Sequence, residues 1–140
     1  MKSEDFISIV SIQIQDGEKE KTELMTSAEI THEGDIYRIS YEDTEATGFE
    51  GSETIIEVRG NNEAVIMRKG TANALMSLET GNRHYCQYGT PFGSMQLGLY
   101  THVIENNLEK DGKLYMKYTI DLNASHLSDN EIIITVNKKG

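Results

Sequence analysis

Hydrophobic and polar residues alternate along most of this chain with a period of two. In residues 6–14, Ile7 and Ile9 share one face of the pattern, whereas Phe6, Val10 and Ile12 share the other. A period of two predicts a β-strand. The same pattern predicts about ten short strands. They lie at residues 6–14, 23–31, 36–42, 54–59, 64–69, 74–79, 83–88, 94–104, 114–122 and 132–136.

Turn signals separate these expected strands. The clearest are Asp16-Gly17, Glu33-Gly34-Asp35, Gly60-Asn61-Asn62 and Lys110-Asp111-Gly112. We interpret the charged residues Glu18–Lys21 as following the first turn outside a strand, and residues 123–130 as a polar loop. Residues 43–52 form the longest stretch without a period. Residues 74–79 include helix formers, but they are too few for a stable helix, so a strand is expected there.

The order of these elements predicts an all-β fold. Short connections make successive strands antiparallel neighbours in an up-and-down meander. Because no amphipathic helix covers a sheet face, the strands are expected to close into a barrel of about eight to ten strands. Such a barrel is either filled by side chains or holds one small ligand. We expect a single domain over residues 1–140, with a strand-rich core over about 6–136.

Composition narrows the function classes. The chain has 13 basic and 23 acidic residues and a net charge of −10, which disfavours nucleic acid and anionic membranes as partners. One cysteine, Cys86, excludes an internal disulfide and fits a reducing compartment. The first residues lack a signal-peptide pattern, and no apolar run approaches the ~20 residues of a membrane span. These observations predict a cytoplasmic protein.

The segment Tyr88-Gly89-Thr90-Pro91-Phe92-Gly93 is the first candidate site. It holds the single proline of the chain and connects two expected strands. Proline restricts its own φ and the residue before it, while glycine permits unusual conformations. Tyr88, Thr90 and Phe92 could therefore form a rigid rim at the barrel mouth. The alternative is a turn that folds over and plugs the barrel end.

A polar cluster of Glu42, Arg68 and Tyr88 is the second candidate. An arginine that faces inward from a strand requires a partner, and Glu42 at the end of an expected strand could supply it. Such a group could grip a carboxylate or a phosphate. The alternatives are an Arg68 that faces outward, and an inward ion pair with a structural role alone.

Metal binding and catalysis find less support. His84 and Cys86 share a strand face, with Leu99 and Leu97 expected opposite them, but His102 has the other parity, so no three-ligand zinc site forms. His32 and His126 are expected in loops, and Cys86 is interpreted as a buried, inert thiol. Glu42-Asp43 reads as a pair of solvated loop charges. No nucleophile or phosphate-loop motif occurs, so we expect no enzyme activity, no metal and no cofactor.

The order of several residues resembles that of the YwiB-like family, bacterial proteins with a calycin-like (lipocalin-like) β-barrel. The residues that carry the resemblance are Tyr41-Glu42, Gly48, Thr54, Arg68 with Gly70, residues 88–93, Thr101 and Tyr118. The run Tyr-x-Thr-Pro-aromatic-Gly is its most specific part. The resemblance covers residues from about 6 to 136 and implies a fold and a cytosolic bacterial origin, but no activity.

Two functions from different classes remain open. The first is a non-enzymatic binding protein for a small hydrophobic or anionic ligand inside the barrel, with Tyr41, Glu42, Arg68, Tyr88, Thr90, Phe92 and Tyr118 as the ligand-binding residues. The second is an interaction module with a filled interior that acts through residues 43–52 or the row Gln96, Tyr100 and His102. An enzyme with an unrecognised site comes third, and either a monomer or a homodimer fits the sequence.

Overall fold

The chain folds as one antiparallel β-barrel. The structure is a computed structural model that describes residues 2–44, 50–70, 73–90, 93–122 and 125–137. The strands of this described part are β1 (Lys2–Gln15), β2 (Glu18–Glu33), β3 (Ile36–Glu42), β4 (Ser52–Arg59), β5 (Glu63–Gly70), β6 (Ala74–Glu79), β7 (Arg83–Thr90), β8 (Gly93–Asn107), β9 (Lys113–Leu122) and β10 (Ser125–Asn137). Each strand pairs with its sequence neighbours, and β1 pairs with β10 to close the barrel. The predicted up-and-down barrel is confirmed.

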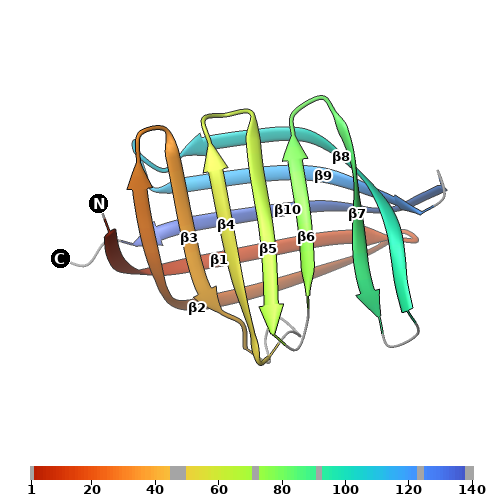
Figure 1. Cartoon of the computed structure of the whole chain (residues 1–140), viewed down its shortest axis with the longest axis horizontal. Helices are drawn as coiled ribbons and strands as arrows, with labels where there is room; N and C mark the ends of the chain where they lie inside the picture. Colours follow the sequence, from red (N-terminus) through yellow and green to blue (C-terminus); the bar gives the residue numbers. More distant parts are fainter. Residues whose placement is uncertain (1, 45–49, 71–72, 91–92, 123–124, 138–140) are drawn as a thin grey trace.

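The barrel strands form two groups that cross each other (Figure 1). The short strands β3–β6 pass in front of the long strands β1, β2 and β8–β10 at a steep angle. Among the described residues there is no helix, and hence none long and apolar enough to cross a membrane. The interior between the two groups of strands therefore has to hold the core.

The core follows the alternation of the sequence. Ile7 and Ile9 of β1 face inward and are buried, whereas Phe6 on the opposite face is half exposed. Most of the other buried apolar side chains likewise come from alternate strand positions and form one cluster. Its fully buried members include Ile39, Ile56, Val58, Leu78, Leu99, Leu114, Met116 and Ile134. These residues fill one part of the barrel interior densely.

Several predicted strand boundaries were wrong. Glu18–Lys21 belongs to β2, and most of the expected polar loop at residues 123–130 belongs to β10, which begins at Ser125. His32 lies in β2 and His126 in β10, so neither histidine is in a loop. The charged start of β2 is compatible with a strand because it pairs with residues 12–15 of β1 and needs no buried face.

Two junctions of the barrel have incomplete ladders. β2 pairs with β3 through Glu29–Glu33, so the described residues 18–28 of β2 pair with β1 alone. Between β6 and β7 the described ladder is the pair Ala74 and Tyr88. The free edge of β2 alternates Glu and Lys from residue 18 to 21, which discourages pairing with another chain. The barrel is thus closed but loosely joined beside the first half of β2.

Candidate ligand cavity

A cavity of about 310 Å³ lies inside the barrel next to the first half of β2. Its lining comes from seven strands on both sides of the barrel. The residues are Ile9, Ser11, Ile12, Gln13, Glu20, Thr22, Leu24, Tyr41, Ile66, Arg68, Met76, Tyr118, Asn130, Glu131 and Ile132. The lining therefore combines apolar side chains with an arginine, two glutamates and several uncharged polar groups.

Strand register builds one wall of the cavity from a cross-strand row of polar residues. Tyr41 of β3 pairs with Thr54 of β4, and Thr54 pairs with Arg68 of β5. Residues opposite each other on paired strands present their side chains to the same face of the sheet. Tyr41 and Thr54 are buried, and Arg68 borders the cavity. Arg68 therefore faces inward, and the alternative of an outward arginine is excluded.

The acidic partner of Arg68 is Asp43, which directly follows β3. The Nε atom of Arg68 lies 3.5 Å from Asp43 Oδ2 and donates a hydrogen bond of 3.1 Å to Thr54 Oγ1. The Thr54 hydroxyl in turn donates to Asp43 Oδ2 over 2.6 Å. The Asp43 side chain is 0% exposed, whereas that of Arg68 is 17% exposed. The buried carboxylate thus holds the guanidinium in place, and the guanidinium borders the cavity, whose lining also includes Glu20 and Glu131.

Backbone contacts fix the position of Asp43. Its N–H donates a 2.8 Å hydrogen bond to the carbonyl of Ser52 at the start of β4. Close by, Gly70 at the end of β5 has a φ of +123°, and a Cβ there would overlap the carbonyl oxygen of Gly51. Glycine is therefore required where the ends of β4 and β5 approach each other. Gly70 pairs with Ser52, the residue whose carbonyl accepts the hydrogen bond from Asp43.

A second polar row forms the opposite wall. Tyr118 of β9 pairs with Asn130 of β10, and Asn130 pairs with Gln13 of β1. Asn130 is buried and its Nδ2 donates a 3.0 Å hydrogen bond to Ser128 Oγ. Tyr118, Asn130 and Gln13 line the same cavity as Tyr41 and Arg68. The polar groups of the cavity therefore converge from both sides of the barrel.

The two tyrosines act as neutral hydrogen-bonding groups. Burial raises the pKa of Tyr118 to about 12. Burial and the negative charge of Asp43 raise the pKa of Tyr41 to about 12, against the opposing effect of Arg68 and of hydrogen bonds with Thr54 and Arg68. Both hydroxyls therefore keep their protons at neutral pH. They can donate to an acceptor in the cavity but cannot serve as bases there.

Comparison with known proteins supports the fold and assigns the chain to a family. A family model described as a domain of unknown function, DUF1934, matches residues 7–134. The chain belongs to the DUF1934 family. The crystal structure of the YwiB protein from Bacillus subtilis matches with a TM-score of 0.75 and 21% sequence identity, over 98% of this chain and 94% of that chain. At this identity the match shows the fold alone. No curated protein matches the chain.

The expected YwiB-like membership is thus confirmed, and three of the expected site residues converge. Tyr41, Arg68 and Tyr118 all border the cavity of this DUF1934 protein. The expected role of Glu42 was wrong. Glu42 is exposed, because strand alternation turns it to the outer face next to the inward Tyr41. Asp43, which the sequence analysis counted as a solvated charge, is buried and takes that role.

The hairpin at residues 88–93 can be judged from part of its backbone. Tyr88 pairs with Ala74 and Met95, and Thr90 pairs with Gly93, which confirms the hairpin itself. Phe92, with Pro91, lies outside the described residues, as do the side chains of Tyr88 and Thr90. The expected rim and the alternative plug both stay predictions.

Sequence reasoning missed Asp43, Thr54 and Asn130. The residue opposite an inward arginine on the next strand is a signal that could have found Thr54. Asn130 was hidden because residues 123–130 were interpreted as a loop. Asp43 lies one residue beyond β3, where alternation no longer predicts the direction of a side chain.

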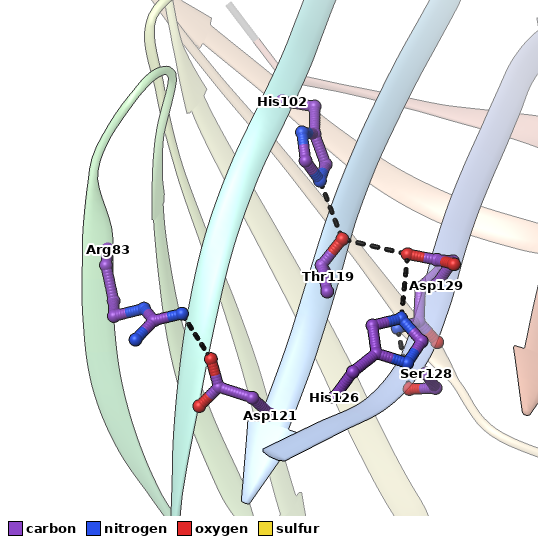
Figure 2. Close-up of polar contacts among 8 residues, drawn as sticks. Arg83, His102, Thr119, Asp121, His126, Ser128 and Asp129 are labelled. Carbon is purple, nitrogen blue, oxygen red and sulfur yellow. Dashed lines mark hydrogen bonds and ion pairs between the residues drawn. The ribbon is translucent and has the colours of Figure 1, made fainter. Parts of the chain in front are cut away.

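Histidines of the outer surface form a separate polar network (Figure 2). His102 Nε2 lies 2.6 Å from Thr119 Oγ1, which donates to Asp129 Oδ1 over 2.9 Å. His126 Nε2 lies 3.2 Å from the same carboxylate oxygen. Hydrogen bonds from His126 and Thr119 lower the pKa of Asp129. No group of three or more metal-ligating side chains occurs within the described residues.

The expected neighbours of His84 and Cys86 are confirmed. His84 pairs with Leu99 and Cys86 with Leu97. His84 Nε2 lies 3.2 Å from Glu79 Oε1, so it takes part in a contact between β7 and the end of β6. Cys86 is half-buried rather than buried as expected. This partial burial raises the pKa of its thiol, which therefore stays protonated at neutral pH.

Proposed function

We propose that this barrel is a non-enzymatic, cytoplasmic binding protein for a small molecule that carries an oxyanion, either a carboxylate or a phosphate. The observation that carries the proposal is the arrangement of Arg68, which borders the cavity while its partner Asp43 lies fully buried behind it. Arginine in such a setting binds planar or tetrahedral oxyanions through paired N–H donors.

The size and lining of the cavity favour a small ligand with an apolar body. Pockets for small molecules start at about 300 Å³, so this cavity holds a molecule at the low end of that range. Five apolar side chains also line the cavity. They are Ile9, Leu24, Ile66, Met76 and Ile132. A short hydrocarbon or ring would lie against them while its acidic group meets the guanidinium.

The neutral tyrosines support binding rather than catalysis. A general base for neutral pH needs a pKa near 7, whereas Tyr41 and Tyr118 have a pKa of about 12. Their hydroxyls can add hydrogen bonds to the ligand. Donors of this kind stabilise a bound oxyanion without changing it.

The interaction module predicted as the alternative needs a filled interior. The 310 Å³ cavity speaks against that version of it. Among its expected contacts, Gln96 and His102 are exposed and Tyr100 is half-buried, whereas residues 45–49 of its other contact lie outside the described part of the chain. The cavity therefore makes ligand binding the better-supported function.

Calorimetric titration with octanoate, hexyl phosphate and octanol tests the proposal. We expect octanoate or hexyl phosphate to bind and octanol, which lacks the oxyanion, to bind at least about tenfold more weakly. The comparison of the two acids distinguishes a carboxylate from a phosphate site. Tighter binding of octanol than of both acids would contradict the proposed role of Arg68.

The variants for this titration must keep the interior neutral. Arg68→Met alone leaves the buried Asp43 without this cation, so the double variant Asp43→Asn with Arg68→Met is the better test. Arg59→Met removes an exposed arginine on the outer face and is the matched control. The double variant should lose oxyanion binding while the control keeps it, and equal loss in both would refute a cavity site.

A further inference from the structure

Glu20 is the carboxylate of the cavity lining that no described residue satisfies. It lies on the inward side of β2, in the alternating row Glu20, Thr22 and Leu24, and it is exposed where the cavity meets the free edge of β2. Within the described part of the chain, its side chain has neither a hydrogen bond nor an ion pair. The other glutamate of the lining, Glu131, accepts a hydrogen bond from the Tyr115 hydroxyl. Glu20 is therefore available to a ligand.

A smaller hollow of about 140 Å³ adjoins the cavity at Glu20 and makes this rim acidic. The residues that line the hollow are Gln13, Gln15, Asp16, Glu18 and Glu20. Three of them carry carboxylates and two carry amides, and no described lysine or arginine lines the hollow. The two lysines beside Glu20 in sequence, Lys19 and Lys21, have the outward parity of β2, and Lys21 pairs with Glu23 over 3.1 Å. The rim therefore favours a positively charged group.

One row of paired residues connects the rim with the buried interior. Glu20 of β2 pairs with Gln13 of β1. Gln13 pairs with Asn130 of β10, which pairs with Tyr118 of β9. These four strands are consecutive neighbours in the barrel (Figure 1), so the row spans three strand intervals, or roughly 14 Å. Because Tyr118 is buried and Glu20 is exposed, the cavity extends from the interior of the barrel to its surface.

The two ends of the cavity offer opposite hydrogen-bonding groups. The interior end offers donors, which are the guanidinium of Arg68, with a side chain 17% exposed, and the hydroxyls of the buried Tyr41 and Tyr118. Towards the rim, the amide nitrogen of Asn130 already donates within β10, and its Oδ1 accepts no hydrogen bond from the described residues. That oxygen and the Glu20 carboxylate can accept hydrogen bonds from a ligand. The lining thus suits an acceptor at one end and a donor at the other.

We propose that the ligand of this cavity carries a cationic amine in addition to its oxyanion, with an apolar chain between the two charges, and that Glu20 binds the amine. Because Arg68 holds the oxyanion, this amine site rests on the proposed function. An oxyanion without a cation is repelled by the carboxylates of the rim, whereas an amine at the rim is attracted to them. The apolar side chains of the lining contact the chain between the charges. An ω-amino carboxylate or an ω-amino phosphate has this chemistry.

Calorimetric titration with two matched pairs of ligands tests the amine site. The pairs are octanoate with ω-aminooctanoate, and hexyl phosphate with ω-aminohexyl phosphate, and the members of each pair differ by one ammonium group. The pair whose simple acid binds more tightly decides the test. We expect its amino ligand to bind at least about fivefold more tightly than the simple acid. Equal or weaker binding of the amino ligand would overturn the amine site and leave the proposed function standing.

Two variants of β2 locate the effect. Glu20→Gln removes the charge at the rim, and the affinity ratio of amino ligand to simple acid should fall below about twofold. Glu23→Gln makes the same change on the outward face of the strand and is the matched control, which should keep the ratio of the original protein. Thermal unfolding of each variant shows that its barrel is intact. A ratio that Glu20→Gln leaves unchanged, or that both variants lower equally, would contradict binding of the amine by Glu20.

Ligands with the amine alone separate failure of the amine site from failure of the proposed function. Octylammonium and hexylammonium lack the oxyanion, and we expect them to bind at least about tenfold more weakly than the amino ligand of the same chain length. Equal binding would show that the oxyanion adds nothing, which would overturn the proposed function and the amine site together. Failure of every acid and amino ligand to bind would have the same consequence.

Discussion

The two ends of the barrel interior are built on the same strands with opposite chemistry. Along β5 the inward residues run from Ala64 through Ile66 to Arg68, and along β9 they run from Leu114 through Met116 to Tyr118. The inward residues also change from apolar to polar along β3, β4 and β10. The apolar end is densely packed, whereas the polar end holds the cavity. The difference indicates that the apolar end supplies stability, whereas the polar end suits the ligand binding that we propose.

The energetic reason for this division is the cost of polar burial. A buried arginine, carboxylate or hydroxyl stabilises a fold poorly compared with a packed apolar side chain, unless a partner satisfies it. Asp43, Thr54 and Arg68 satisfy one another within 3.5 Å. An interior filled with Leu and Ile throughout would be easier to stabilise, so the polar end is consistent with the binding function that we propose.

Truncation at the apolar end should produce the largest loss of stability. Leu114 is 0% exposed, and Leu114→Ala removes its packing and leaves a cavity among well-packed neighbours. We expect the free energy of unfolding to fall by about 2–5 kcal/mol. Urea unfolding measures this change. A loss below about 1 kcal/mol would show that the apolar end does not carry the stability.

Removal of the buried cation should have the next largest effect. Arg68→Met leaves the Asp43 carboxylate buried without this partner, and because Arg68 is 17% exposed we expect a loss of about 2–3 kcal/mol. The double variant Asp43→Asn with Arg68→Met should recover at least half of that loss in the same unfolding experiment. Equal stability of the single and double variants would contradict the ion pair.

The tyrosines of the cavity predict a loss of stability at high pH. The pKa of Tyr118 is about 12 in the fold and 10.0 in its reference state, so the fold favours the protonated hydroxyl. This contribution is fully present below pH 10 and is lost as the pH rises through about 12. Unfolding followed from pH 9 to about 12 should show a smaller decline for Tyr118→Phe than for the original protein. Tyr85→Phe, at an exposed tyrosine, should behave like the original.

The outer histidine network should show the smallest effect. His126→Ala removes one of the hydrogen bonds that lower the pKa of Asp129, a carboxylate near the surface. The fold favours the charged carboxylate, so this contribution is present above pH 3.8 and declines as the pH falls. At neutral pH we expect a stability change within about 0.5 kcal/mol. Ligand binding should be unchanged in this variant, which would show that the outer network does not contribute to the cavity site.

Much of this architecture could be predicted from alternation alone. The ten strands, their antiparallel order and the closure of the barrel followed from the period of two and the turn signals. Strand ends could not be predicted, because β2 begins among charged residues that pair with β1 without being buried. At such a position the backbone pairs through hydrogen bonds while both side chains stay in solvent, so the polarity of the side chains does not reveal the strand.

The cavity residues could be predicted where a large polar residue occupies an inward position of a strand. Tyr41, Arg68 and Tyr118 are large polar residues at inward positions, and all three border the cavity. Asp43 was not predictable, because its direction depends on the backbone contact with Ser52 beyond the end of β3. The exposed face of β1 was visible in the sequence as a second apolar row, but alternation alone does not say which of two apolar faces is buried.

Nuclear magnetic resonance titration of the Arg68 side-chain Nε–H with octanoate tests the central claim most directly. The claim is that the polar end of the barrel binds a small oxyanion through Arg68. We predict a saturable shift of the Arg68 Nε–H signal, together with backbone shifts confined to strands that line the cavity, and no shift of the Arg59 side chain. Saturable binding that leaves the Arg68 signal unchanged and shifts residues of the outer surface would contradict it.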